Sequence, residues 1–155
     1  MSELSHLDES GRARMVDIGD KPVSDRSATA EAIVTMGDEI RRALFSGGLP
    51  KGDALAVVRI AAIMAAKRTP DLIPLCHPLA LTSIGVEVEE VPDGAQILVT
   101  VATTGRTGVE MEAMTGAAIG AVALYDMVKG LDRGVEIGPV RLLSKAGGSS
   151  GEWRR

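Results

Sequence analysis

Aromatic side chains are scarce in this chain, which has one tryptophan, one tyrosine and one phenylalanine among 155 residues. The core must therefore consist of Ala, Val, Ile, Leu and Met, whose small members allow close backbone packing. The scarcity also removes the stacking platforms on which single-stranded nucleic acids bind. Excess basic charge is missing too, because 17 Lys and Arg face 21 Asp and Glu, for a net charge of −4. We therefore expect no nucleic-acid partner.

Cysteine and histidine are also rare, with one cysteine and two histidines. A single cysteine excludes an intramolecular disulfide and suits a reducing compartment. The N-terminus shows neither the basic nor the apolar stretch of a secretion signal, and no apolar run reaches the length of a membrane span. We expect a cytoplasmic protein without a membrane partner. Its length fits a single domain over 1–155.

Hydrophobic periodicity predicts four strands and two helices, the first helix being broken in two. Alternating apolar residues mark the two middle strands, and Pro92-Asp93-Gly94 predicts a hairpin between them. Asp38 and Asp53 are plausible caps for the two halves of the first helix, and Gly47-Gly48 ends its first half. The strands are expected at 28–36, 81–91, 95–104 and 135–144, and the helices at 38–45, 53–67 and 110–131.

This order of elements is the β-α-β-β-α-β pattern of a ferredoxin-like sandwich, an α+β fold with an antiparallel sheet. The helices would cover one face of the sheet, and a partner subunit is the simplest cover for the other face. Gly116 and Gly120 lower helix propensity and predict the close approach of another backbone. Residues 1–26 are expected to form a mobile arm and 147–155 a flexible tail.

The segment 67–79 contains Pro70, Pro74 and Pro78 together with the only cysteine and one histidine. Proline fixes φ and restricts the preceding residue, so the segment is predicted to be stiff and mostly non-helical. His77 either places a ligand or hydrogen-bonds to backbone at a strand start, and the residues alone weigh these equally. A metal site with Cys76 is disfavoured, because adjacent side chains of an extended chain point to opposite sides.

Charged residues on the long helix form a second candidate site. Asp126 and Lys129 are three residues apart and therefore face the same way. On a surface such an ion pair is worth under about 1 kcal/mol, but its neighbours are apolar, which favours a cleft. Glu112 lies on nearly the same side of the helix but roughly 21 Å away along its axis. The two carboxylates can share a pocket only if a second subunit contributes.

Several cations lie in loops or at helix ends, where phosphate contacts are plausible: Lys51, Lys67, Arg68, Arg106 and Lys145. Lys51 precedes a helix N-terminus, where an anion would be favoured. Lys67 and Arg68 contribute only if the turn folds them toward the same pocket. The Gly-Ser loop after Lys145 could wrap a phosphate, although its composition alone favours a disordered tail.

Taken in order, these segments resemble the cyclic pyranopterin monophosphate synthase family, protein C of molybdenum-cofactor biosynthesis. Pro70 occupies a position that varies in that family and leaves the resemblance intact. The matching stretches span almost the whole chain: 15–18, 51–53, 65–79, 107–113, 125–129 and 145–151.

The resemblance implies a ferredoxin-like subunit in a homohexamer, a trimer of dimers with active sites at a dimer interface. It implies a phosphorus–oxygen lyase that converts the GTP-derived (8S)-3′,8-cyclo-7,8-dihydroguanosine 5′-triphosphate to the pterin cyclic pyranopterin monophosphate, with release of pyrophosphate. No cofactor and no protein-held metal are expected, and Mg²⁺ accompanying the triphosphate stays open.

Residue roles follow from the same resemblance, motif by motif. Asp126 matches the acid/base position, and Lys51 and Lys129 match catalytic lysines. Expected substrate contacts are Leu75, Cys76, His77, Met111 and Glu112, with Arg26, Lys67, Arg68, Arg106 and Lys145 as further candidates. A non-catalytic ferredoxin-like module that senses a small molecule is the alternative, since fold does not decide function. A structural oligomerisation protein is a third reading, and chemical turnover separates the first from both.

Overall fold

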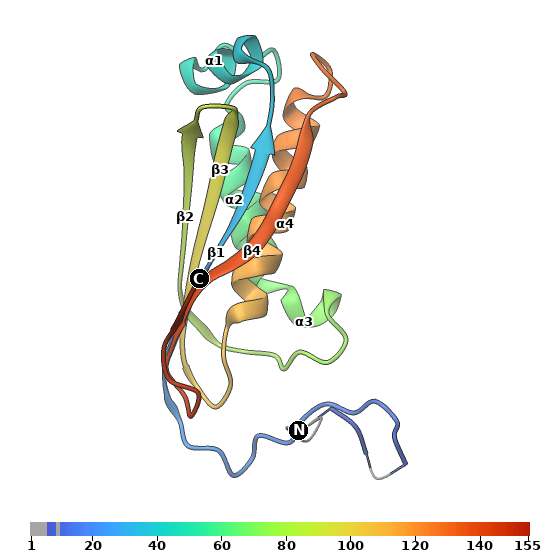
Figure 1. The fold of residues 1–155 in the computed structure, drawn as a ribbon, viewed down its shortest axis with the longest axis vertical. Helices are drawn as coiled ribbons and strands as arrows, with labels where there is room; N and C mark the ends of the chain where they lie inside the picture. Colours follow the sequence, from blue (N-terminus) through green and yellow to red (C-terminus); the bar gives the residue numbers. More distant parts are fainter. Residues whose placement is uncertain (1–5, 9) are drawn as a thin grey trace.

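Five strands and four helices follow one another in the computed structural model, which describes residues 6–8 and 10–155 (Figure 1). Without the small α3 and β5, their order is the predicted β-α-β-β-α-β with a divided first helix. In chain order the elements are β1 (Ser24–Thr35), α1 (Asp38–Ser46), α2 (Ala54–Lys67), α3 (Thr69–Leu72), β2 (Leu81–Val91), β3 (Gly94–Gly105), α4 (Glu110–Val128), β4 (Glu136–Ala146) and β5 (Trp153–Arg154).

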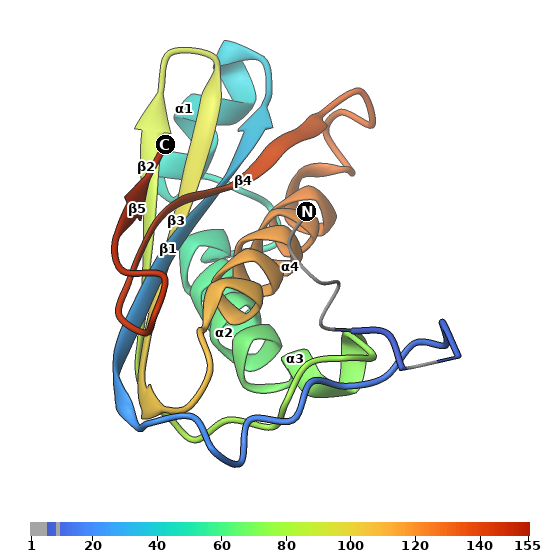
Figure 2. The ribbon, with the colours of Figure 1, turned by 60° about the horizontal axis from the view of Figure 1, so that its bottom comes forward.

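The strands form one antiparallel sheet in the order β2-β3-β1-β4-β5. β1 lies between β3 and β4, so that Ala30 pairs with Val99 on one side and Leu142 on the other. Helices α2 and α4 pack against one face of the sheet, and no helix covers the opposite face within the described residues (Figure 2). The predicted α+β ferredoxin-like fold is confirmed, and a partner over the open face stays a prediction.

Small residues let the helices approach the sheet and each other closely. Ala28, Ala30, Ala32 and Val34 alternate along β1 and are all buried. On α4, a Cβ added at Gly116 would lie 3.1 Å from the carbonyl oxygen of Ala62 in α2. The close backbone approach predicted from the helix glycines is confirmed, and it explains how a core with so few aromatics fills its space.

Both ends of the sheet extend beyond the predicted strands. β1 begins at Ser24, inside the predicted arm, because it pairs with β3 over its full length, from Ser24 opposite Gly105 onward. β5 lies inside the predicted tail and pairs with the end of β4. Neither extension has an alternating apolar pattern, because the start of β1 is polar throughout and β5 has only two residues, so the hydrophobic periodicity did not mark them.

The proline segment contains one helical turn, α3, and is otherwise mostly non-helical, as predicted. Thr69 continues from α2 by donating its hydroxyl to the carbonyl oxygens of Ala65 (3.2 Å) and Ala66 (3.0 Å). Pro70 lies in the first turn of α3, where a missing N–H breaks no helical hydrogen bond. Beyond α3 the backbone becomes extended at Ile73, as predicted.

The helix ends follow the expected chemistry with one exception. The Asp53 side chain caps α2 by accepting from the backbone N–H of Ala56 at 3.0 Å, and Gly47 ends α1 with a left-handed φ of 76°. The cap of α1, however, is Gly37 and not Asp38, which lies in the first turn of the helix. A carboxylate in the first turn still favours the helix, because it faces the positive end of the helix dipole.

Helix α4 is 19 residues long and apolar enough, by length and composition alone, to cross a membrane. This corrects the prediction that no segment reaches that length. In the fold α4 is a core helix that packs against α2, β1, β3 and β4, and buried core helices share this composition.

Candidate functional site

A hollow of about 260 Å³ lies at the N-terminal end of α4 and is called the His77 hollow here. Three segments distant in sequence build its wall: the arm, the extended chain after α3, and the start of α4 with its preceding loop. Its lining residues are His6, Val16, Ile18, Lys21, Leu75, Cys76, His77, Leu79, Thr107, Gly108, Glu110, Met111 and Glu112.

The fold brings five predicted substrate contacts together in the His77 hollow. Leu75, Cys76 and His77 come from the proline segment, and Met111 and Glu112 come from the first turn of α4. The turn after α3, closed by a hydrogen bond from the Cys76 N–H to the Ile73 carbonyl (3.1 Å), directs the chain along this helix end. Proline on either side of the Leu75-Cys76-His77 tripeptide limits its movement.

Burial controls the charge of two groups in the His77 hollow. Glu112 is only 3% exposed, and burial raises the pKa of its carboxyl, with a smaller contribution from nearby Glu110. Burial, and then the Glu112 charge, raise the pKa of the Cys76 thiol. A thiol held protonated is a poor nucleophile, in line with the weak reactivity expected of Cys76. This buried carboxyl and the His77 imidazole line the same hollow, and side chains of both kinds can donate and accept protons.

A second hollow of about 230 Å³ adjoins the first and is called the Lys145 hollow. It gathers four cations and a single carboxylate, so its charge favours an anion. Its lining residues are Lys21, Arg26, Ser27, Arg106, Thr107, Gly108, Glu110, Lys145, Ala146, Gly147, Ser149 and Ser150. Arg26, Arg106 and Lys145, which were predicted from dispersed motifs, thus lie together.

Contacts with backbone or side-chain oxygens hold three of the four cations of the Lys145 hollow. Arg26 Nε donates to the carbonyl oxygen of Gly105 at 3.1 Å, and an Arg106 amino group donates to the carbonyl of Gly19. Lys145 Nζ lies 4.0 Å from a Glu110 oxygen and also contacts the Ser150 hydroxyl. The loop needs glycine at Gly147, where φ is 92° and a Cβ would lie 2.1 Å from the Asp25 carbonyl oxygen.

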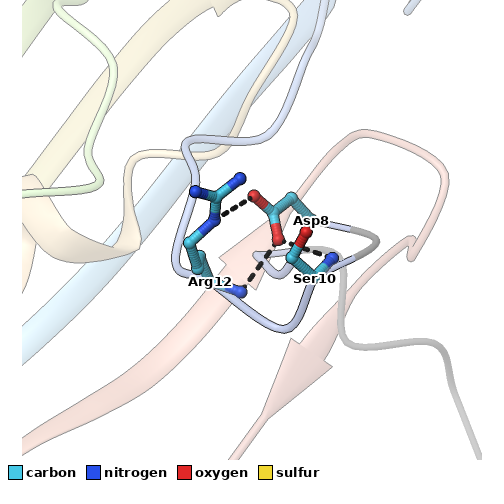
Figure 3. Close-up of polar contacts among 3 residues, drawn as sticks. All are labelled: Asp8, Ser10 and Arg12. Carbon is cyan, nitrogen blue, oxygen red and sulfur yellow. Dashed lines mark hydrogen bonds and ion pairs between the residues drawn. The ribbon is translucent and has the colours of Figure 1, made fainter.

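The arm reaches the His77 hollow through two local turns. The Asp8 carboxylate accepts from the N–H groups of Ser10 (2.8 Å) and Arg12 (2.9 Å) and from Arg12 Nε (3.1 Å) (Figure 3). The Arg12 backbone N–H is the main cause of the lowered pKa of Asp8. This turn brings Arg14 back to His6, whose carbonyl accepts the Arg14 N–H at 2.8 Å. His6, the second histidine, thereby joins the wall of the hollow.

Asp126 lies between two lysines at the opposite end of α4. Its Oδ1 is 2.7 Å from Lys129 Nζ and its Oδ2 is 3.3 Å from Lys51 Nζ. Hydrogen bonds first from Lys129 and then from Lys51 lower the pKa of Asp126, and Asp126 raises the pKa of Lys129. All three side chains are about half exposed. The cluster therefore holds an ionised carboxylate and a proton-bearing amine at an open surface.

Lys51 contacts Asp126, while the phosphate contact suggested by its place before a helix N-terminus stays a prediction. Its ammonium donates to the backbone carbonyl of Asp126 at 2.6 Å, at the C-terminal end of α4. The last carbonyls of a helix lack internal partners and carry partial negative charge, so they attract cations. The structure thus pairs Lys51 with Asp126.

Two of the predicted substrate contacts, Lys67 and Arg68, lie apart from both hollows. Lys67 lines a separate space of about 410 Å³ beside β2, together with Ile63 and Ile84. Arg68 is exposed at the end of α2, where its backbone N–H bonds to Met64 and Ala65. Within one chain, the turn does not fold these two cations toward the His77 hollow. Asp126 is likewise distant, because it follows Glu112 by fourteen helical residues, roughly 21 Å.

Sequence reasoning missed several residues that line the hollows, namely Lys21, Thr107, Glu110, Ser149 and Ser150. Lys21 belongs to a segment that composition marks as an arm. The available signal was Asp17-Ile18-Gly19, an Asx-turn sequence in which Asp17 Oδ1 accepts the Gly19 N–H at 2.8 Å. A turn at this point indicates that the backbone of the arm is ordered here, so that its side chains can line a hollow.

Known proteins resemble this chain over nearly its full length. The model of the MoaC family matches residues 15–148. The "Cyclic pyranopterin monophosphate synthase" of Roseiflexus sp. (strain RS-1) is 54% identical over 155 residues, covering 99% of this chain and 98% of that protein. The protein of the same name from Corynebacterium glutamicum (strain R) is 52% identical over 153 residues, with 99% and 98% covered.

Proposed function

This chain belongs to the MoaC family, and we propose that it is an enzyme of molybdenum-cofactor biosynthesis with cyclic pyranopterin monophosphate synthase activity. The substrate is (8S)-3′,8-cyclo-7,8-dihydroguanosine 5′-triphosphate, and the products are cyclic pyranopterin monophosphate and pyrophosphate. The enzyme is a phosphorus–oxygen lyase, since a substrate hydroxyl displaces pyrophosphate from the phosphorus nearest the sugar.

One observation carries this proposal: the His77 hollow and the cationic Lys145 hollow share a rim. The His77 hollow offers an imidazole and a buried carboxyl for the polar edge of a purine-derived ring. The Lys145 hollow offers four cations for the triphosphate. Charge-assisted hydrogen bonds to phosphate are strong, and several together stabilise the charge that develops on the leaving pyrophosphate.

Proton transfers fall to Asp126, Lys51 and Lys129, which we assign to the partner subunit at each site. Opening one ring and closing another requires groups that donate and accept protons. Asp126 raises the pKa of Lys129 in this chain. We therefore assign Asp126 the role of positioning the Lys129 amine and favouring its protonated form, and the two lysines the role of exchanging protons with the substrate. In a two-fold dimer, the same surface of each chain supplies both halves of two equivalent sites.

A homohexamer built as a trimer of such dimers, in the cytoplasm, completes the proposal. No resident cofactor is required. Mg²⁺ would enter with the triphosphate, because the Lys145 hollow offers a single carboxylate among four cations, and such a donor set does not suit a protein-held Mg²⁺.

Incubation of the purified protein with the cyclic dihydro-GTP substrate tests the function. Pyrophosphate and the pterin product should appear in equal amounts and disappear in Asp126→Asn. Tight binding of the substrate with no product would reject the proposal and favour the small-molecule-sensing module.

A further inference from the structure

Lys21 lines both the His77 hollow and the Lys145 hollow. Among residues 6–8 and 10–155, three others do so: Thr107, Gly108 and Glu110. Within that part of the chain, Lys21 is thus the only cation on the shared rim. A ligand that fills both hollows must pass this rim where its ring system joins its phosphates.

The backbone at Lys21 is held in place by neighbouring contacts. Its N–H donates to the Ile18 carbonyl at 3.1 Å, which closes a turn. Within that turn, the Gly19 carbonyl accepts from Arg106, itself a wall residue of the Lys145 hollow. The arm is therefore tied to the loop before α4 two residues from Lys21.

The Lys21 ammonium is available for a ligand. Its side chain is exposed and forms no ion pair across 6–8 and 10–155. Of the carboxylates in the part of the chain that the structure describes, only Glu110 lies on the shared rim, with its Oε1 4.0 Å from Lys145 Nζ. The other cations of the Lys145 hollow, in contrast, already contact backbone or side-chain oxygens.

We infer that Lys21 binds the phosphate group adjacent to the ring system, the one that the product retains. This inference rests on the proposed function. At that phosphorus a substrate hydroxyl oxygen forms the new P–O bond, the P–O bond to pyrophosphate breaks, and the hydroxyl proton passes to a base. An ammonium there stabilises the charge on the non-bridging oxygens, whereas Arg26 and Lys145 hold the two phosphates that leave.

Titration of four full-length variants with two ligands tests this assignment. Lys21→Met should weaken binding of cyclic pyranopterin monophosphate about tenfold, as expected for one charge-assisted hydrogen bond, and should leave pyrophosphate binding nearly unchanged. Lys145→Met should show the opposite pattern. Lys21→Arg should retain most of the affinity for the product. Arg14→Met, an equal change of charge elsewhere on the arm, should alter neither affinity.

Equal affinities of wild type and Lys21→Met for the cyclic monophosphate would overturn the assignment, as would a larger loss for pyrophosphate than for product. The thermal unfolding midpoint of Lys21→Met should match that of wild type, since the side chain has no partner to lose. Turnover by the wild-type protein is measured separately. Its absence rejects the proposed function, while the two titrations still decide the role of Lys21.

Discussion

Two carboxyl groups on one helix have opposite protonation tendencies because their surroundings differ. Glu112 is buried, which raises its pKa, whereas Asp126 lies between two ammonium groups, which lower its pKa. Groups whose environments separate their pKa values are suited to distinct acid and base roles. At the scale of single residues, α4 therefore carries a carboxyl with a raised pKa at its start and one with a lowered pKa near its end.

Asp126→Asn should reduce turnover by about 10²-fold or more, the usual contribution of a positioned proton-transfer group. The asparagine cannot hold the charge that keeps the proton on Lys129, so the pKa of Lys129 should fall. Steady-state kinetics measures the loss. Asp132→Asn is the matched control, because its side-chain oxygen can still accept the Gly134 N–H, and it should remain active. Near-normal turnover in Asp126→Asn would remove this residue from the mechanism.

Glu112→Gln should stabilise the protein by an amount that grows as the pH rises. The folded pKa of Glu112 lies above its ordinary value of 4.5, so the folded state binds more protons than the unfolded state between the two pKa values. Wild-type stability contributed by this group is therefore present below 4.5 and is lost as pH rises through the folded pKa. Unfolding midpoints of both proteins from acid to neutral pH test this, and a difference independent of pH would contradict it.

At the scale of elements, the contact between α2 and α4 depends on glycine. A Cβ at Gly116 would meet the Ala62 carbonyl at 3.1 Å and Val99 Cγ1 at 3.0 Å. At Gly120 the nearest atoms are instead side-chain methyl carbons, at 3.3 Å or more. Side chains adjust more readily than the backbone of a packed helix, so the two glycines are not equivalent.

Gly116→Ala should lower the free energy of unfolding by about 1 kcal/mol, because overpacking costs more than the gain of about 1 kcal/mol in helix propensity. Gly120→Ala should be close to neutral. Denaturant unfolding measures both, and Gly130→Ala, where nothing lies within 4 Å, provides the control. Equal effects at Gly116 and Gly120 would show that the backbone contact does not limit packing.

Sequence patterns predicted the elements well wherever one face is apolar. β2 and β3 alternate, and their hairpin turn lies where the Pro-Asp-Gly signal indicated. The start of β1, the turn α3 and the short β5 were missed for physical reasons. Pairing with neighbouring strands orders the polar start of β1 and the short β5 without any alternating apolar pattern. Pro70 fits the first turn of a helix, although proline in a sequence usually indicates that no helix continues there.

At the scale of the whole molecule, the two groups of candidate residues lie at opposite ends of α4. Sequence motifs identified most members of both groups. Which residues belong to which group could be predicted only in part. Helix geometry separated Glu112 from Asp126, but the meeting of the arm, the proline segment and the glycine loop depends on tertiary structure. Lys21 was missed for the same reason.

Co-expression of His77→Ala with Asp126→Asn should restore activity that neither variant has alone. In a mixed two-fold dimer, one site receives both intact halves, so random pairing gives about a quarter of the wild-type sites. Turnover of the co-purified mixture, normalised to total protein, measures the recovery. A protein in which every chain carries both substitutions controls for residual activity. Complete lack of recovery would place both groups in one chain's site.

The only tryptophan of the chain lies in β5, where it follows directly on the loop of the Lys145 hollow. Trp153 is 41% exposed, and its ring lies 5.9 Å from the Arg155 guanidinium. Its pairing with Lys145 ties the indole to the strand that bears this cation. Tryptophan fluorescence, excited selectively over Tyr125, therefore comes from a single indole beside the Lys145 hollow. If that hollow binds phosphate, as proposed, the protein carries its own optical reporter of binding and requires no added dye.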